Sequence, residues 1–280
     1  MQTIAEILAQ ELGQKQEYVE NVVRLIDEGN TIPFIARYRK EMHGAMDDTT
    51  LRNLETRLTY LRSLQDRRDE VKKAIENQGK LTEELAQAID AAATLTEVED
   101  LYRPYKQKRR TRASIAREKG LEPLAEAIFA QDGRDPQALA RDYVDPEKGV
   151  NTPEEALQGA NDIIAENLSD DADIRKALRQ LVMRRGVFTC KAAEGAEEDG
   201  VYRLYYDFSQ PIPRLLDHQI LAINRGEKEG VLKPAVTLTG NEGAALVCRA
   251  ALKPTAQVSA FVRAAAEDAY DRLIFPAIQR

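Results

Sequence analysis

Residues 47–79 read DDTTLRNLETRLTYLRSLQDRRDEVKKAIENQG and contain the longest helical pattern in the chain. Leucines recur at steps of three or four residues, which places them on one face of an α-helix: Leu51, Leu54, Leu58, Leu61 and Leu64. Val71 and Ile75 continue this face, and Asp47 and Gly79 suit the two ends of a helix. The pattern predicts one helix roughly 45 Å long, against which other elements pack.

Shorter helices are expected before this long one. Apolar residues at helical spacing fill residues 4–12 and 19–26, and Gly13 and Gly29 stand where these helices would end. Two helices joined so closely form an αα-hairpin. In the following stretch GNTIPFIARYRKE, residues 29–41, Pro33 suits the first turn of a third helix. These residues predict a helix-turn-helix-like start.

Capping signals indicate further helices up to about residue 185. Thr96 and Glu99 form a capping-box pattern, which predicts a short helix that ends before Pro104. Asp135-Pro136 and Thr152-Pro153 each combine an N-cap residue with proline at the first helical position. Apolar residues at helical spacing predict additional helices over residues 114–119, 122–129, 156–168 and 174–182.

The pattern changes at Gly186. Residues 187–190 and 201–206 are rich in β-branched and aromatic residues, which favours a small hairpin. Residues 215–225 predict a helix capped by Gly226, and 231–238 predict a strand that Pro234 restricts to an edge. Residues 258–273 are helical again, up to a kink or end at Pro276. The predicted fold class is mainly α: a multi-helix bundle with one long strut helix and a small β element in the last third.

Composition excludes several classes of protein. The 280 residues include 40 Lys and Arg against 47 Asp and Glu, a net charge of −7. A globally basic nucleic-acid-binding protein is therefore excluded, although a local basic patch is not. The start of the chain does not resemble a signal peptide, and no apolar run approaches the roughly 20 residues that span a bilayer. We expect a soluble, cytoplasmic protein with no membrane partner.

The residues needed for most catalytic or metal sites are scarce. The only histidines and cysteines are His43, His218, Cys190 and Cys248, and no two of them have the spacing of metal ligands. The sequence contains no nucleophile elbow and no glycine-rich phosphate loop. We therefore expect no enzymatic activity, no catalytic residue, no metal and no cofactor.

Residues 103–119, RPYKQKRRTRASIAREK, depart most strongly from the acidic average of the chain. This basic segment has one acid, Glu118, and eight cations: Arg103, Lys106, Lys108, Arg109, Arg110, Arg112, Arg117 and Lys119. Cations beside an aromatic residue such as Tyr105 can hold phosphates and stack on a base. The alternative is a solvated loop whose arginines pair with acids of the same chain.

A second group of cations, Arg37, Arg39 and Lys40, follows the helical hairpin. A helix-turn-helix could bring these residues near a phosphate backbone. The alternative, which the sequence favours, is a surface turn after a packed Ile-Pro-Phe-Ile wedge.

Three long stretches resemble one known family: residues 29–41, residues 101–124, and residues 206–212 together with 218–232. They are similar to the N-terminal and central regions of the Tex family of bacterial transcription accessory proteins, which bind RNA. The family is related to a eukaryotic elongation factor and histone chaperone of the Spt class. The similarity extends over essentially the whole chain.

The resemblance implies two domains: a helical N-terminal domain over residues 1–185 and the start of the central region over 186–280. It also implies that a YqgF-like domain of ribonuclease-H fold, a helix-hairpin-helix module and an OB-fold would follow beyond Arg280. No catalytic residue is carried over by the resemblance, because the ribonuclease-H-like domain would lie outside this chain.

Two functions remain open from the sequence. The first is a non-catalytic scaffold of transcription that adds weak, sequence-independent phosphate contacts to RNA or DNA through its basic loops. The second is a structural and protein-interaction module that braces the remaining Tex domains and docks on RNA polymerase or other transcription proteins. The two differ in whether the cations of the basic segment are open to solvent or paired within the chain.

Overall fold

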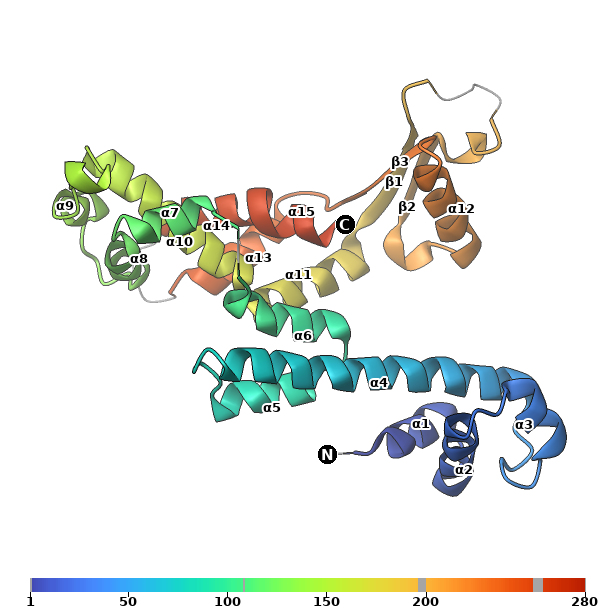
Figure 1. Ribbon diagram of the computed structural model, residues 1–280. Coiled ribbons are helices and arrows are strands. Elements are labelled where there is room, and N and C mark those ends of the chain that lie inside the picture. The colour runs from blue at the N-terminus through green and yellow to red at the C-terminus, as the bar shows by residue number, and fades with distance from the viewer. Residues whose placement is uncertain (1, 108, 196–199, 254–258, 280) are drawn as a thin grey trace. The chain divides into compact units, whose positions relative to one another are not determined.

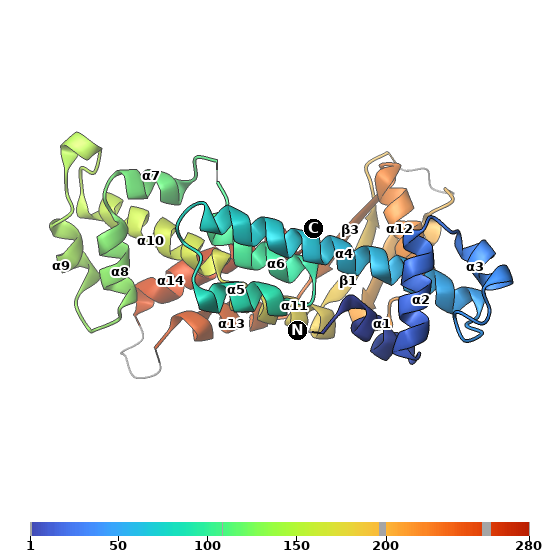
Figure 2. The same cartoon turned by 60° about the horizontal axis from the view of Figure 1, so that its bottom comes forward.

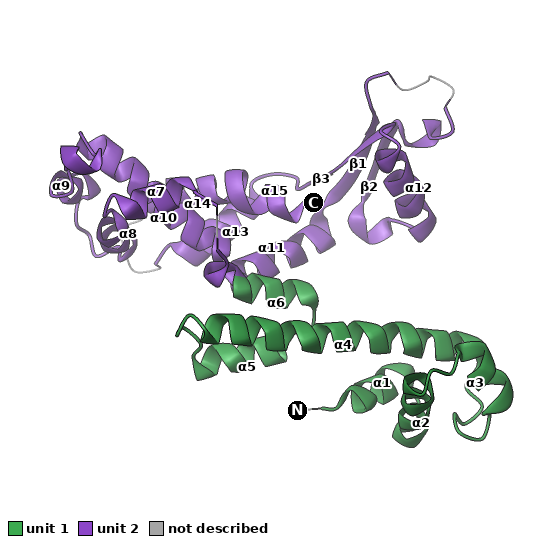
Figure 3. Cartoon of the chain, in the orientation of Figure 1, with its two compact units in different colours: residues 1–102 green, residues 103–280 purple. Residues whose placement is uncertain are grey.

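The computed structural model describes residues 2–107, 109–195, 200–253 and 259–279. The chain folds into two compact units, residues 1–102 and residues 103–280 (Figures 1 and 3). Most of it is helical, and a three-stranded sheet lies in the last third. The predicted mainly α fold with one long helix and a small β element is confirmed.

The first unit is organised along α4, which runs from Asp48 to Glu76 and has 29 residues. The predicted apolar face of this helix is confirmed, since its five leucines, Val71 and Ile75 are all buried. The Asp47 carboxylate accepts a hydrogen bond from the Thr50 amide and so caps the first turn. A helix of this length is stable here because its apolar face is covered by neighbouring helices.

Three helices cover the N-terminal half of α4: α1 (Ile4–Leu12), α2 (Gln16–Asp27) and α3 (Ile32–Tyr38). The predicted end of α1 is confirmed, because Gly13 is left-handed with φ 63°. These helices share one core with α4, which includes Leu8, Val22 and Ile35. Two ion pairs join α1 and α2 to α4 outside this core: Arg57 with Glu11 and Arg62 with Asp27, each at 2.7 Å.

Two short helices, α5 (Glu83–Ala91) and α6 (Leu95–Tyr102), pack on α4 farther along. The predicted capping box at Thr96 and Glu99 was wrong by two residues. The Thr94 hydroxyl accepts from the Glu97 amide, and the Glu97 carboxylate accepts from the Ala93 amide. Glu99 forms an ion pair with Arg67 instead, at 2.6 Å.

The second unit is built around α10 (Pro153–Asp170), which is buried along most of its length. Helices α7 (Arg112–Glu118), α8 (Glu122–Phe129) and α9 (Pro136–Arg141) lie around it in both views (Figures 1 and 2). The predicted N-caps Asp135 and Thr152 are confirmed.

Helices from the end of the chain complete this core. Helix α14 (Ala260–Asp268) and the π-helical segment Ala269–Ile274 pack on α10, and α13 (Glu242–Ala251) packs on α14 and on α11 (Ala172–Arg185). Helix α15 (Phe275–Ile278) follows, so Pro276 stands next to the change from π- to α-helix. Short 3-10 turns connect other elements, at Arg103–Tyr105, Pro146–Lys148, Arg203–Tyr205 and Ile212–Arg214.

The sheet has the order β2-β1-β3, and all of its strands pair antiparallel: β1 (Val187–Ala192), β2 (Asp207–Pro211) and β3 (Leu232–Thr237). Pro234 lies on the edge strand β3, as predicted. The strand predicted over residues 201–206 was wrong. Tyr202 is buried and donates a hydrogen bond to the Glu229 carboxylate at 2.8 Å, and the chain turns there before β2 begins.

Helix α12 (Asp217–Lys228) packs on β3 and extends past its predicted end. Gly226 was predicted as its cap but lies buried inside the helix. A Cβ atom at this position would come within 2.6 Å of Leu232, so glycine is required by close packing. The left-handed residue after the helix is Gly230, with φ 75°.

Candidate nucleic-acid interface

The basic segment begins at the 3-10 turn Arg103–Tyr105 and continues through α7. Thr111 and Ser114 form a reciprocal capping box that fixes the start of α7. The apolar face of α7, with Ala113 and Ala116, packs into the core beside α10. The apolar side of α7 is thus anchored in the core of the second unit.

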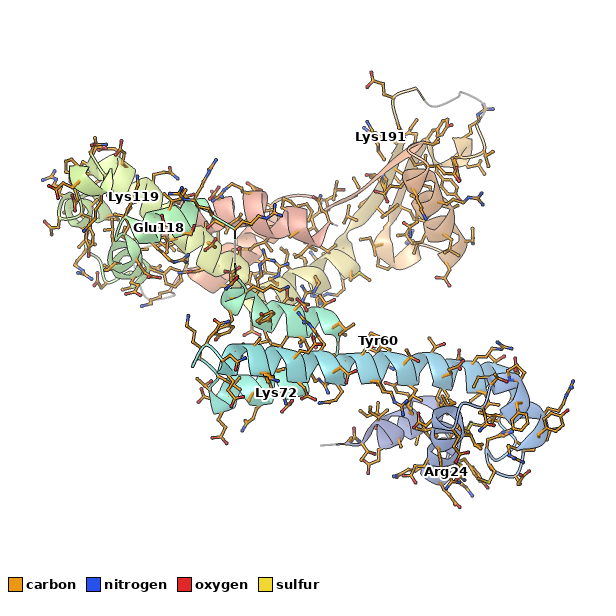
Figure 4. The ribbon with its side chains drawn as sticks, viewed as in Figure 1. Arg24, Tyr60, Lys72, Glu118, Lys119 and Lys191 are labelled. Atoms are coloured by element: carbon orange, nitrogen blue, oxygen red, sulfur yellow. The ribbon has the colours of Figure 1, made fainter. Side chains whose placement is uncertain are left out.

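Arg103, Arg117 and Lys119 are cations of the segment that have partners in other elements of the second unit. Arg103 pairs with Asp170 at 3.0 Å, and Arg117 pairs with Glu166 at 2.7 Å and with Glu122 at 3.1 Å. The Lys119 ammonium donates to the Gly149 carbonyl at 2.7 Å. Lys119 and Glu118 are labelled at the end of α7 in Figure 4.

The acids that hold these arginines form a ladder on α10. Asp162, Glu166 and Asp170 are spaced four residues apart, which places them on one face of the helix. All three are buried. Asp162 pairs at 3.1 Å with Arg272 from the π-helical segment, so each acid of this ladder binds a different arginine.

The environment of Arg117 keeps its guanidinium charged. Burial by itself lowers the pKa of Arg117, but the hydrogen bond and charge of Glu166 raise that pKa above its ordinary value overall. Two opposite charges that are half-buried together stabilise each other, whereas either one alone would be costly to bury. Arg117 therefore serves to anchor α7.

Other cations of the segment face solvent. The side chains of Arg109, Arg110 and Arg112 are exposed. Arg110 approaches Glu118 at 3.5 Å, a pair in which both side chains remain more than 60 % exposed, at 72 % and 62 %. Within the described residues, Arg109 and Arg112 form no ion pair with a carboxylate. These three arginines are named here the open arginines.

The other predicted residues of this segment are Tyr105, Lys106 and Lys108. Lys106 is exposed and takes part in an interaction within the chain, and Tyr105 is half-buried and does the same. Lys108 lies outside the described residues.

The second predicted group lies at the end of α3. Arg37, Arg39 and Lys40 are all exposed. The predicted Ile-Pro-Phe-Ile wedge is only partly packed: Ile32 and Ile35 are buried, whereas Phe34 is 36 % exposed. Tyr38 is 57 % exposed. Sequence reasoning missed Phe34 and Tyr38 as surface residues, although Phe34 follows Ile32 by two residues, a spacing that places the two on different faces of a helix.

The two cysteines are poorly placed for nucleophilic chemistry. Cys190 and Cys248 are buried, and burial raises the pKa of both thiols, which disfavours the reactive thiolate. Among the described residues, no group of three or more His, Cys, Asp or Glu could hold a metal ion. No helix in the described part of the chain is long and apolar enough to span a bilayer.

Together these features define a class: a mainly helical protein with a small sheet and two solvent-facing groups of cations. Family comparison makes the assignment specific. Residues 2–76 match the Tex-like protein N-terminal domain, and residues 131–272 match the Tex central region-like domain. The chain belongs to the Tex family.

Individual relatives agree with this assignment. The chain is 50 % identical over 232 residues to Protein tex of Bordetella pertussis, covering 82 % of this chain and 29 % of the relative. It is 42 % identical over 234 residues to Transcriptional accessory protein Tex of Neisseria gonorrhoeae, covering 83 % and 31 %. It is 30 % identical over 294 residues to human S1 RNA-binding domain-containing protein 1, covering 99 % and 29 %. The chain spans about a third of the length of the curated relatives it matches.

The two groups of cations differ in their position relative to the two matched regions. Arg37, Arg39 and Lys40 lie within the N-terminal match, whereas the basic segment, residues 103–119, lies between the two matched regions. The boundary predicted after residue 185 remains a prediction.

Proposed function

We propose that this chain is a non-catalytic scaffold of a transcription accessory factor that adds sequence-independent phosphate contacts to RNA or DNA. The observation that carries the proposal is the exposure of the open arginines in the middle of a segment that is paired to α10 on both sides of them, at Arg103 and at Arg117. Exposed guanidinium groups are well suited to phosphate oxygens, because they donate in a planar fork. The names of two relatives, which refer to transcription and to RNA binding, support the same role.

The acidity of the whole chain limits the affinity expected. A net charge of −7 repels a polyanion at long range, so contacts must form locally where cations gather. Binding by this chain should therefore be weak, independent of sequence and strongly reduced by salt.

The test is fluorescence anisotropy of labelled single-stranded RNA and DNA at low salt. We expect binding by the unmodified chain and at least about tenfold weaker binding when the three open arginines are changed to glutamate. The matched control changes three other exposed arginines of the same unit, Arg141, Arg184 and Arg249, to glutamate. This control alters the net charge equally but keeps the open arginines. It should therefore weaken binding only slightly.

Two results would contradict the proposal. One is no binding by the unmodified chain at low salt. The other is equal weakening by the two triple variants, which would show that binding follows net charge and not the open arginines.

A structural and protein-interaction role is the second candidate, and the ion pairs of Arg103 and Arg117 favour it. In this role the chain braces the other domains of a longer Tex protein and docks on RNA polymerase or another transcription protein. A pull-down with purified RNA polymerase tests it. Capture that persists in the Arg109→Glu, Arg110→Glu, Arg112→Glu variant would support this role, and absence of capture would argue against docking on the polymerase.

A further inference from the structure

The outer face of α3 carries two aromatic rings that the core does not use. Ile32 and Ile35 point into the core of the first unit and are buried. Phe34 and Tyr38, four residues apart on the helix, are exposed, as is Arg37. Exposed aromatic rings lose the free energy of burial that such large side chains usually gain. Their location on one face therefore indicates a contact surface.

The two rings are close enough to act together. Their centroids are 5.2 Å apart, with an angle of 45° between the ring planes. They border a shallow hollow whose lining residues are Pro33, Phe34, Ala36, Arg37, Tyr38, Lys40 and Asp48. The hollow thus combines flat apolar surface with charged groups at its border.

The charge around this hollow is mainly positive. Arg37 and Lys40 line it, and the Arg39 guanidinium lies 5.4 Å from the centroid of the Phe34 ring. Asp48 is the one acid of the lining and pairs with Arg52 at 2.7 Å, which reduces its effect on the hollow. An anionic ligand with a flat apolar part matches this combination.

Single-stranded nucleic acid has both features. Each nucleotide carries a phosphate and a base, and the faces of unpaired bases are available for stacking on aromatic rings. The bases of a duplex already stack on one another, so a duplex offers mainly phosphates to the same surface. A hydrophobic peptide would not make use of the surrounding cations.

We propose that Phe34 and Tyr38 form a stacking platform for an unpaired base of single-stranded RNA or DNA, with Arg37 and Lys40 contacting the adjacent phosphates. This inference rests on the proposed function and adds a second point of contact, which binds the face of a base as well as phosphates. It distinguishes the α3 surface from the open arginines, which would contact phosphates of any strand.

The experiment follows an oligonucleotide that contains 2-aminopurine, whose fluorescence is quenched when the base stacks. The Phe34→Ala, Tyr38→Ala double variant should lose most of the change in fluorescence caused by binding, and its affinity should fall about fivefold or more. Tyr38→Phe keeps a ring and should bind like the unmodified chain. Phe129→Ala is the matched control, since it removes a ring that is 38 % exposed in the other unit.

The readouts separate this inference from the proposed function. The platform is overturned, and the function kept, if the double variant is folded by circular dichroism, binds with unchanged affinity and retains the 2-aminopurine signal. It is also overturned if Tyr38→Phe loses as much affinity as Tyr38→Ala, or if the double variant weakens duplex binding as much as single-strand binding. Absence of binding by the unmodified chain would overturn both.

Discussion

At the scale of single residues, the fate of each arginine in the basic segment depends on the acid that the fold places beside it. Arg103 and Asp170 are 67 positions apart in the sequence, and Arg117 and Glu166 are 49 apart. No local pattern indicates such partners, so the sequence alone left open which of these cations pair with acids of the chain. Arg117 differs from Arg112 because it lies beside Glu166 of α10. This proximity is visible only once α7 and α10 are packed together.

Glu166 should contribute far more to the stability of the fold than Glu118, the one acid of the basic segment. Glu166→Ala leaves the half-buried Arg117 without its closest carboxylate, and we expect a loss of about 3 kcal/mol in the free energy of unfolding. Glu118→Ala removes only an exposed pair with Arg110, so we expect a change below about 1 kcal/mol. Urea unfolding followed by circular dichroism measures both. Equal losses would show that the ladder on α10 does not hold α7.

At the scale of elements, local signals located most helices and the strands β1 and β3, but not β2. Caps at Asp47, Asp135 and Thr152 and the leucine spacing of α4 depend on neighbours within one turn or on one face, so the sequence reveals them. Helices α5 and α13 were missed. Strand β2 was missed because residues 207–211 become extended by pairing with β1. The more β-prone residues 201–206 form a turn instead, in which Tyr202 is buried.

The ion pairs between α4 and the first two helices predict how pH affects the first unit. Hydrogen bonds from Arg57 and Arg62 lower the pKa of Glu11 and of Asp27 below their ordinary values of 4.5 and 3.8. A carboxylate with a lowered pKa stabilises the folded state above its ordinary pKa, and this contribution is lost as the pH falls through the folded value. We therefore expect stability to fall on acidification below about pH 4.5.

The variant that tests this is Arg57→Gln with Arg62→Gln. It should be less stable than the unmodified chain at neutral pH, and the difference should shrink as the pH is lowered through the acid range. Arg52→Gln is the matched control, because the pair of Arg52 with Asp48 lies within α4 and joins no two elements. Thermal melting of the full chain at several pH values measures the effect. A difference that is independent of pH would contradict the role given to these two pairs.

At the scale of the whole molecule, the sequence predicted the fold class and family resemblance, and the structure divided the predicted cations into two kinds. Arg103, Arg117 and Lys119 have partners within the chain, and Arg109, Arg110 and Arg112 extend into solvent. We propose that three exposed arginines on an acidic protein form a small binding surface. It suits an auxiliary contact within proteins that are about three times as long as this chain.

The dependence of RNA affinity on salt tests the central claim most directly. Each phosphate neutralised on a single strand contributes about 0.7 to the slope of log affinity against log salt. We predict that changing the three open arginines to alanine lowers the magnitude of this slope by about 2, whereas Arg141→Ala, Arg184→Ala, Arg249→Ala leaves it unchanged. Equal slopes for the unmodified chain and the variant of the open arginines would contradict the account.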